Sequence, residues 1–246
     1  MRLELNLYNF SNSPLGFNYN ESLRGIILEN LENVDRALSK EFHDDPHHIF
    51  NFSNILGHSY IKNNNLYIKR GILFISSPDK EFILKSIKGF LKKPLISITN
   101  NKTYTKYSVV NMRIYEQNLE NINRFQTVSP IILKLKNQLF KDKYQYVYID
   151  NKSTEADIEL WKDTLIKSIK SRYEFFTGDS VDYINVNLNS KDFYSKYIKI
   201  KNQRYLCTAG KLELNTNSKV KEFINDIGIG SKLKFGFGLL EGVTNE

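Results

Sequence analysis

Hydrophobic residues alternate with polar ones over the first ten residues and then recur at intervals of three and four, which predicts a strand followed by a helix. Leu3, Leu5 and Leu7 give the period of two, and the apolar stripe that follows predicts one helix over residues 21–42. Later signals in this half are extended stretches over residues 48–55 and 66–76, a helix opened by Ser77-Pro78-Asp79, and a strand over residues 103–115. The predicted order is therefore strand, helix, strand, strand, helix, strand.

The same order of elements recurs from about residue 125. Thr154, followed three residues later by Asp157, predicts a capped helix whose apolar stripe extends to Phe176. A half-buried strand is expected where Ile184, Val186 and Leu188 alternate with asparagines, and a last strand through Leu233, Phe235, Phe237 and Leu239. Two such repeats predict an α+β protein with tandem ferredoxin-like (RRM-like) domains, each an antiparallel sheet with helices on one face.

The polar stretch over residues 116–123 is the natural linker between the two repeats. We therefore expect an N-terminal domain over residues 1–122 and a C-terminal domain over residues 123–246. Many unrelated functions use the ferredoxin-like unit, so the fold alone does not give the function. Its sheet surface is also the platform on which RNA-recognition modules stack bases.

Composition favours a globular protein with an anionic partner. The 246 residues include 35 lysines and arginines against 27 aspartates and glutamates, a net charge of +8. This charge attracts phosphates, although a solvated basic surface without a partner has the same composition. Apolar runs are short, as at residues 72–75, and the first ten residues lack the apolar block of a secretory peptide. We expect a cytoplasmic protein without a membrane partner, in which the single Cys207 forms no intramolecular disulfide.

A glycine-rich segment near the C-terminus is the first candidate for binding RNA. Glycine lets backbone N–H groups approach a phosphate closely, and two lysines within the segment add positive charge. The alternative interpretation is a helix that ends at Gly228, followed by a strand whose small residues relieve packing. The spacing does not fit a P-loop. The candidate RNA-binding residues are Gly228, Gly230, Lys232, Lys234, Gly236 and Gly238.

Four stretches, in order along the chain, carry a family resemblance. They are residues 18–25, residues 42–53 with Phe42-His43-Asp44 and Phe50-Asn51-Phe52-Ser53, residues 127–131, and residues 228–238. Together they resemble the RAMP superfamily of CRISPR systems, and in particular its precursor-processing endoribonucleases, Cas family six. The resemblance implies a metal-independent endoribonuclease that binds and cleaves CRISPR repeat RNA in the precursor transcript to give mature guide RNAs. It implies attack by the ribose 2′-hydroxyl, leaving a 2′,3′-cyclic (or 3′) phosphate and a 5′-hydroxyl.

All four histidines lie within residues 43–58, and imidazole titrates close to neutral pH. By the resemblance, His43 stands in the family's catalytic position as general acid or base, and His48 where relatives place a lysine that stabilises the transition state. His47 is a second candidate for that place, and His58 is expected to be structural. Leu28 occupies the helix face where some relatives carry a catalytic tyrosine, so the identity of the base stays open. A solvated loop whose histidines have no role gives the same local pattern.

Alternatives to this hypothesis remain open at the level of sequence. The pair His43-Asp44 also occurs in metal-dependent HD phosphohydrolases, but those sites draw ligands from several helices, and no metal-binding spacing is present. We therefore expect no metal and no cofactor. The second hypothesis is a noncatalytic repeat-RNA-binding subunit of a CRISPR interference complex, with the other subunits as partners, and the chain is expected to be a monomer or homodimer. Weaker candidates for RNA contacts are Arg24, Lys88, Lys92, Lys93, Lys167, Lys170 and Arg172.

Overall fold

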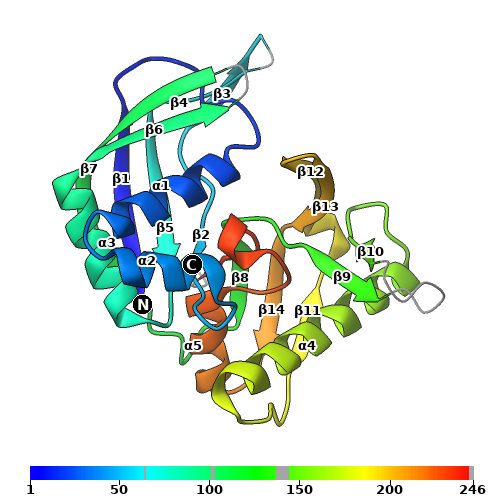
Figure 1. Ribbon diagram of the computed structural model, residues 1–246. Helices are drawn as coiled ribbons and strands as arrows, with labels where there is room; N and C mark the ends of the chain where they lie inside the picture. Colours follow the sequence, from blue (N-terminus) through cyan, green and yellow to red (C-terminus); the bar gives the residue numbers. More distant parts are fainter. Residues whose placement is uncertain (64, 101–102, 137–143, 244–246) are drawn as a thin grey trace. The chain divides into compact units, whose positions relative to one another are not determined.

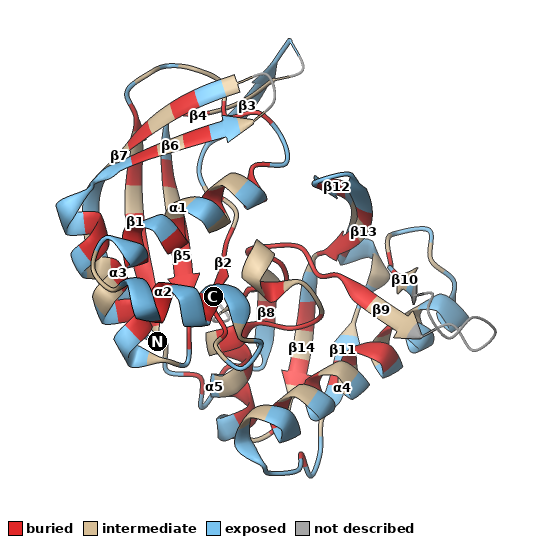
Figure 2. Ribbon diagram, in the orientation of Figure 1, coloured by how far each residue is buried: buried red, intermediate tan, exposed pale blue. Residues whose placement is uncertain are grey.

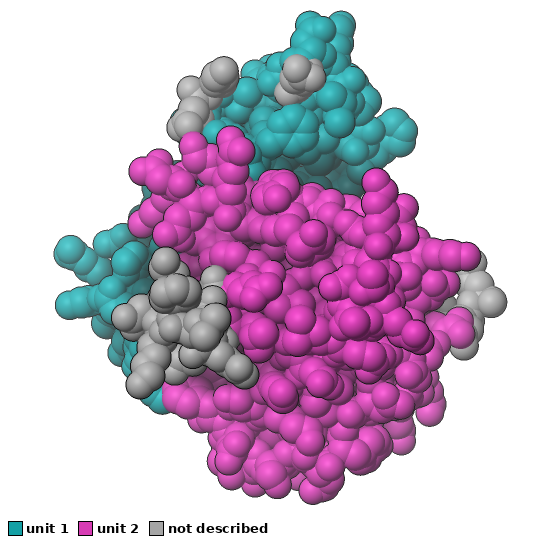
Figure 3. Space-filling model, turned by 90° about the vertical axis from the view of Figure 1, so that its right-hand side faces the viewer, with its two compact units in different colours: residues 1–116, 234–236 teal, residues 117–233, 237–246 magenta. Residues whose placement is uncertain are grey.

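The computed structural model describes residues 1–63, 65–100, 103–136 and 144–243, which form two compact units (Figure 1), each with its own buried core (Figure 2). The first unit comprises residues 1–116 and 234–236, and the second comprises residues 117–233 and 237–246 (Figure 3). Three residues from the glycine-rich segment thus belong to the first unit, which no sequence pattern indicated. The predicted domain boundary at residues 122 and 123 stays a prediction.

The first unit is built on an antiparallel five-stranded sheet in the order β2-β5-β1-β7-β6. The central strand β1 pairs with β5 on one side and with β7 on the other, where the register shifts between Asn6 and Leu7. A separate hairpin, β3-β4, completes the unit. The elements are β1 (Arg2–Asn9), α1 (Asn20–Glu32), α2 (Arg36–Asp44), β2 (Asn51–Phe52), β3 (Ser59–Lys62), β4 (Asn65–Ile68), β5 (Arg70–Ser76), α3 (Lys80–Lys92), β6 (Leu95–Asn100) and β7 (Thr103–Tyr115).

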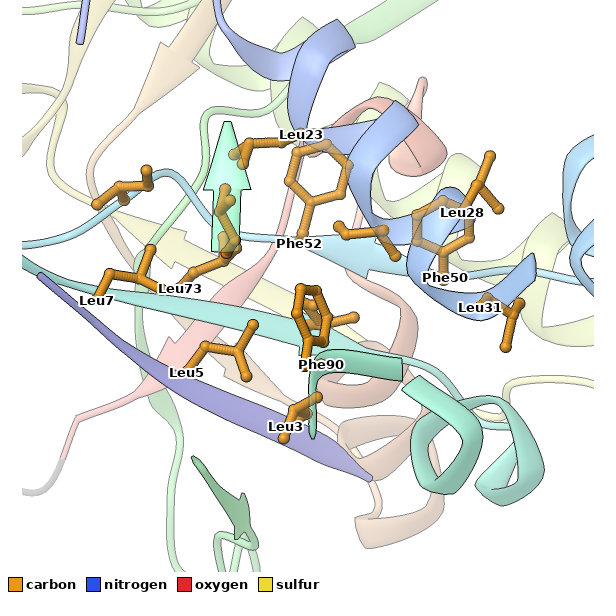
Figure 4. Packing of buried hydrophobic residues seen from close by; sticks show 14 of the residues in the cluster. Leu3, Leu5, Leu7, Leu23, Leu28, Leu31, Phe50, Phe52, Leu73 and Phe90 are labelled. Carbon is orange, nitrogen blue, oxygen red and sulfur yellow. The ribbon is translucent and has the colours of Figure 1, made fainter. Parts of the chain in front are cut away.

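Alternation along β1 determines which face of this sheet meets the helices. Leu3, Leu5 and Leu7 are at most 2% exposed. Figure 4 shows them on the side of the sheet where Leu23 of α1 and Phe90 of α3 complete the core. Burial of apolar surface is the main favourable contribution to folding, so the period of two in the first ten residues fixes the helix-covered face.

The single helix predicted over residues 21–42 is wrong, because the structure has two helices that are separated at residues 33–35. Asp35 is the N-cap of α2, and its carboxylate accepts a hydrogen bond from the backbone N–H of Leu38 at 3.0 Å. The carboxylate also pairs with Lys85 of α3. These contacts, the Leu38 bond above all, hold the pKa of Asp35 below its ordinary value. A cap residue inside the apolar stripe therefore starts a new helix, and that helix carries His43.

The second unit also combines helices with antiparallel sheets, which confirms the predicted class of tandem ferredoxin-like domains. Its four-stranded sheet has the order β11-β14-β8-β15, and β9-β10 and β12-β13 form separate pairs. No helix among the described residues is both long and apolar enough to cross a membrane. The elements are β8 (Arg124–Thr127), β9 (Leu133–Lys136), β10 (Tyr144–Val147), α4 (Glu155–Thr177), β11 (Asn185–Leu188), β12 (Tyr194–Ile200), β13 (Gln203–Ala209), β14 (Lys211–Asn215), α5 (Ser218–Ile227) and β15 (Leu240–Gly242).

The last strand, predicted through residues 233–239, is wrong. Leu233–Phe235 form a short 3-10 helix, and β15 begins only at Leu240. The four glycines of residues 228–238 all have a positive φ, between 72° and 82°. Extended strands require a negative φ, so these glycines override the period-two pattern of the large apolar residues between them.

We expect Thr154→Ala to lower the free energy of unfolding of the second unit by about 1 kcal/mol, the usual effect of removing a helix N-cap. The Thr154 side chain accepts a hydrogen bond from the backbone N–H of Asp157. In return, the Asp157 carboxylate accepts one from the backbone N–H of Thr154 at 2.9 Å, so the predicted capping box is confirmed. Trp161, the only tryptophan, is fully buried in the same helix, and its fluorescence during urea unfolding measures the change. Thr154→Ser keeps the hydroxyl, and an equal loss in that control would contradict the explanation.

Candidate active site

His43 lies in the last turn of α2, where its ring is bonded to the following residue. Nδ1 of His43 is 2.7 Å from Oδ1 of Asp44, and 58% of the His43 side chain is exposed. The bond from His43 holds the pKa of Asp44 below its ordinary value, so Asp44 is an ionised acceptor at neutral pH. A carboxylate can only accept, so Nδ1 carries the proton and Nε2 is the nitrogen that can exchange one with a substrate. The pair has the features of a general acid or base with an orienting partner.

His43 lines an open pocket of about 420 Å³ beside α1 and α2. Three cationic side chains, Arg24, Arg36 and Lys40, line the same pocket. Arg36, Lys40 and His43 are four and three residues apart, a spacing that puts them on one face of a helix. Arg36 and Lys40 were not among the site residues predicted from the sequence, although their spacing from His43 could have indicated them. The pocket also has acidic neighbours, Glu29, Glu32 and Asp44.

Arg24 is the most enclosed of these cations. Its guanidinium carbon is 4.9 Å from the centre of the Phe235 ring, and its Nε is buried without a hydrogen-bond partner among the described residues. Burial lowers the pKa of Arg24, and the nearby Glu21 opposes this effect. A buried N–H without a partner is costly, and the described residues leave this donor unused.

His48 is not among the residues that line this pocket. Its ring packs against the edge of Phe42, with the centroids 5.2 Å apart, and its Nε2 lies 3.9 Å from Oε2 of Glu41. His47 and His58 are exposed. The described residues therefore bring three cationic and three acidic side chains, but no second histidine, to the pocket of His43. The predicted role of His48 stays a prediction.

Four backbone N–H groups of the glycine-rich segment donate to the protein's own carbonyls, the first being that of Gly228, which donates to Ile224 O at 2.7 Å. The N–H of Ile229 donates to Gly238 O at 2.9 Å, that of Gly238 to Pro130 O at 2.8 Å, and that of Ser231 to Ile132 O at 2.8 Å. The four glycines are buried, and Gly228 is the C-cap of α5, as in the alternative interpretation of the sequence. The positive φ of these glycines, and the close backbone neighbours that a Cβ at Gly230 or Gly238 would meet, explain why the segment needs glycine. Contacts of Gly228, Gly230, Gly236 and Gly238 with RNA stay predictions.

The two lysines of the segment have different surroundings. Lys232 belongs to the second unit, where its Nζ is 5.6 Å from the centre of the Tyr205 ring. Lys234 belongs to the first unit, where its Nζ donates to the carbonyl oxygens of Phe42 at 2.7 Å and Asp45 at 2.6 Å. Burial lowers the pKa of Lys234, and the charge of Arg24 lowers it further. The predicted RNA contacts of both lysines stay predictions.

Among the described residues, no three or more His, Cys, Asp or Glu side chains are grouped so that they could hold a metal ion.

Two of the weaker candidates for RNA contacts, Lys93 and Arg172, are either paired with a carboxylate or buried. Lys93 pairs with Glu29 at 2.5 Å, and burial lowers the pKa of Arg172 to about 10. Neither is a freely solvated cation.

Two family models match the chain: CRISPR-associated protein Cas6, N-terminal, over residues 14–109, and CRISPR associated protein Cas6, C-terminal, over residues 114–242. CRISPR-associated endoribonuclease Cas6 1 of Methanocaldococcus jannaschii is 24% identical over an alignment of 251 positions, which covers 100% of this chain and 94% of that relative.

Solved structures share the fold over the whole chain. One, described as the characterization of a Cas6-related gene from Pyrococcus furiosus, has a TM-score of 0.84 at 23% identity and covers 100% of this chain and 99% of its own. Another, described as an RAMP protein binding different RNA substrates, has a TM-score of 0.82 at 22% identity and covers 99% of this chain and 100% of its own. At these identities, the likeness shows the fold.

Proposed function

Because the chain belongs to the Cas6 family of CRISPR-associated proteins, we propose that it is a metal-independent endoribonuclease that cleaves CRISPR repeat RNA in the precursor transcript to give mature guide RNAs. The name of the Methanocaldococcus relative, an endoribonuclease, supports this class of activity. The similar RAMP protein that binds RNA supports RNA as the ligand. The net charge of +8 supports a polyanionic substrate whose binding weakens as salt rises.

The observation that carries the proposal is the His43–Asp44 pair at a pocket whose lining includes three cations beside three carboxylates. A phosphate in this pocket would lie near Arg24, Arg36 and Lys40. Their positive charge would offset the negative charge that develops on the phosphorane, which is the kind of preorganised stabilisation that lowers barriers most. The His43 ring is exposed at the same pocket. This supports proton transfer between His43 and either the ribose 2′-oxygen or the departing 5′-oxygen beside that phosphate.

The proposed reaction needs two proton transfers and no water. The ribose 2′-oxygen loses its proton and bonds to the adjacent phosphorus, while the bond from phosphorus to the 5′-oxygen breaks. The products are a 2′,3′-cyclic phosphate and, once the 5′-oxygen gains a proton, a 5′-hydroxyl. His43 would accept the first proton or donate the second. Leu28 lines the same pocket but has no group that can carry out the other transfer.

Other parts of the proposal concern residues outside this pocket. His48 is proposed to help stabilise the transition state, with His47 as the second candidate. The glycine-rich segment, residues 228–238, is proposed to contact the RNA backbone, with Lys232 as its charged group, whereas the ammonium of Lys234 is already bonded to the carbonyls of Phe42 and Asp45. In the proposed division, residues 1–122 carry the histidines and residues 123–246 carry this segment.

The test uses RNA transcribed from the CRISPR repeat of the array that neighbours the gene. In the presence of EDTA we expect one cut per repeat. A 2′-deoxy substitution at the cleaved nucleotide removes the nucleophile, so that cut should disappear while binding persists. The downstream product should accept a label from polynucleotide kinase without prior phosphatase treatment, because it carries a 5′-hydroxyl. A requirement for a divalent metal, or cleavage of the 2′-deoxy substrate, would contradict the proposal.

Leu28 favours a second candidate function, that of a noncatalytic repeat-RNA-binding subunit of a CRISPR interference complex. An apolar side chain that is 7% exposed stands at the pocket, where the resemblance implies a tyrosine in some relatives. Tight binding of the repeat without cleavage, with protein in excess over RNA, would support this function in place of the first.

A further inference from the structure

The segment Lys234–Gly236 belongs to the first unit, although the chain on both sides of it belongs to the second. Nδ2 of Asn20 donates to the carbonyls of Phe235 at 3.0 Å and Gly236 at 3.3 Å. The Arg24 guanidinium also lies over the Phe235 ring. Asn20 is 4% exposed, and hydrogen bonds shielded from water are electrostatically stronger. The backbone that follows Lys234 is therefore anchored in the first unit.

The close approach of Gly236 to the core strengthens this anchor. A Cβ at Gly236 would lie 2.3 Å from a ring carbon of Phe52, which is fully buried in the core of the first unit. No side chain fits there without displacing that ring. The segment is thus packed against the core at Gly236 and bonded to Asn20 at Phe235 and Gly236, so the Lys234 side chain starts from a defined position.

From this position, Lys234 reaches the end of α2. Its Nζ donates to the carbonyl oxygens of Phe42 at 2.7 Å and Asp45 at 2.6 Å. The last carbonyls of a helix have no partner within the helix, and a cation there also interacts favourably with the negative end of the helix dipole. The two carbonyls stand on either side of His43 and Asp44 in the chain, so the lysine fixes both ends of the segment that carries the pair.

The ammonium of Lys234 is partly buried and lies among other charged groups. The charged groups around its ammonium are Arg24, Asp44 and Asp45. Burial and the guanidinium of Arg24 disfavour its charge, whereas the two carboxylates favour it. Holding a charged side chain partly buried beside another cation is unfavourable, so its hydrogen bonds to α2 must compensate for this.

We propose that Lys234 is a positioning residue that fixes the last turn of α2 and thereby holds His43 and Asp44 at the pocket. This inference rests on the proposed function of His43 in cleavage. An ammonium has three donors, and two of them are used by the protein's own carbonyls, so Lys234 acts through α2. A phosphate contact would have a different signature, because its loss weakens RNA binding and lowers the salt dependence.

The test is Lys234→Met in the full chain, which keeps a long unbranched side chain but removes the charge and the donors. With protein in excess over repeat RNA, we expect the single-turnover rate to fall about 10- to 100-fold, the size of effect produced by a displacement of about 1 Å at a catalytic group. The dissociation constant for RNA should change little. Lys234→Arg keeps the charge and donors and should recover part of the rate, whereas Lys232→Met, in the same segment, should weaken RNA binding.

Amide hydrogen exchange tests the positioning role without any cleavage. The N–H of Asp45 donates to Glu41 O at 2.9 Å and closes the last turn of α2. In Lys234→Met we expect this amide to exchange about tenfold faster, as a local opening would allow. The amides of α1 and α3 should keep their exchange rates, which shows that the unit remains folded.

The two readouts separate this inference from the proposed function. If the unaltered protein binds repeat RNA but does not cleave it, the proposed function fails, and exchange at Asp45 still decides the positioning role. Exchange at Asp45 that is unchanged in Lys234→Met would overturn the inference. So would weaker RNA binding with an unchanged rate at saturation.

Discussion

His43→Ala is expected to lower the single-turnover rate of repeat-RNA cleavage by about 10²- to 10⁴-fold, the contribution of one positioned acid or base. No other histidine is among the described residues that line the pocket, so no second imidazole can take over the proton transfer there. Arg24, Arg36 and Lys40 remain in the variant, and RNA binding should therefore persist. The His43 side chain is largely exposed, so its loss should leave the fold intact.

His58→Ala is the matched control for this experiment. His58 is an exposed histidine of the same unit, so both variants replace one exposed imidazole by a methyl group. We expect the cleavage rate of His58→Ala to equal that of the unaltered protein. Both variants are compared with the unaltered protein by single-turnover cleavage and by RNA binding at the same salt concentration. Full activity of His43→Ala would refute the assignment of His43.

Gly238→Ala is expected to lower the free energy of unfolding of the second unit by about 3–4 kcal/mol, from a left-handed backbone conformation and weakened hydrogen bonds. Gly238 has a φ of +72°, and a Cβ there would lie 1.7 Å from the carbonyl oxygen of Ile229. That atom is backbone, so no side-chain rotation can relieve the overlap. Moving the chain would disturb the bonds from Ile229 N–H to Gly238 and from Gly238 N–H to Pro130. Urea unfolding followed by Trp161 fluorescence measures the effect.

Gly178→Ala provides the control for the backbone conformation. Gly178 ends α4 with a similar φ of +76°, but a Cβ there has no heavy atom within 4 Å. Its substitution should cost only about 1–2 kcal/mol, the penalty for a left-handed conformation. Equal losses in the two variants would show that the overlap at Ile229 does not matter.

Features that depend on local sequence could be predicted. The alternation of Leu3, Leu5 and Leu7 identified β1 and its buried face, because a period of two has one structural meaning in a strand. The spacing of Thr154 and Asp157 identified the start of α4, because a capping box needs only residues three apart. The position of His43 at the end of a helix followed in the same way, although the break at Asp35 was missed.

Features that depend on long-range packing could not be predicted. The spacing of the large apolar residues in residues 233–239 fits a strand, and only the contacts of the folded chain reveal that the intervening glycines are needed at a positive φ. The bonds between Lys234 and the end of α2 join residues that have no common pattern in the sequence. A lysine near glycines therefore indicated a phosphate contact, whereas its described partners are backbone carbonyls.

The bond between Lys234 and Phe42 joins residues that are 192 positions apart. The ribosome therefore makes Phe42 well before it makes Lys234. At a synthesis rate of about 5–20 residues per second, the residues of α2 are made roughly 10–40 s before Lys234. During that interval the chain contains His43 but not yet the lysine that bonds to the end of α2. A nascent chain, or one broken off before residue 234, would therefore carry every group of the His43 pocket but not the lysine that secures it.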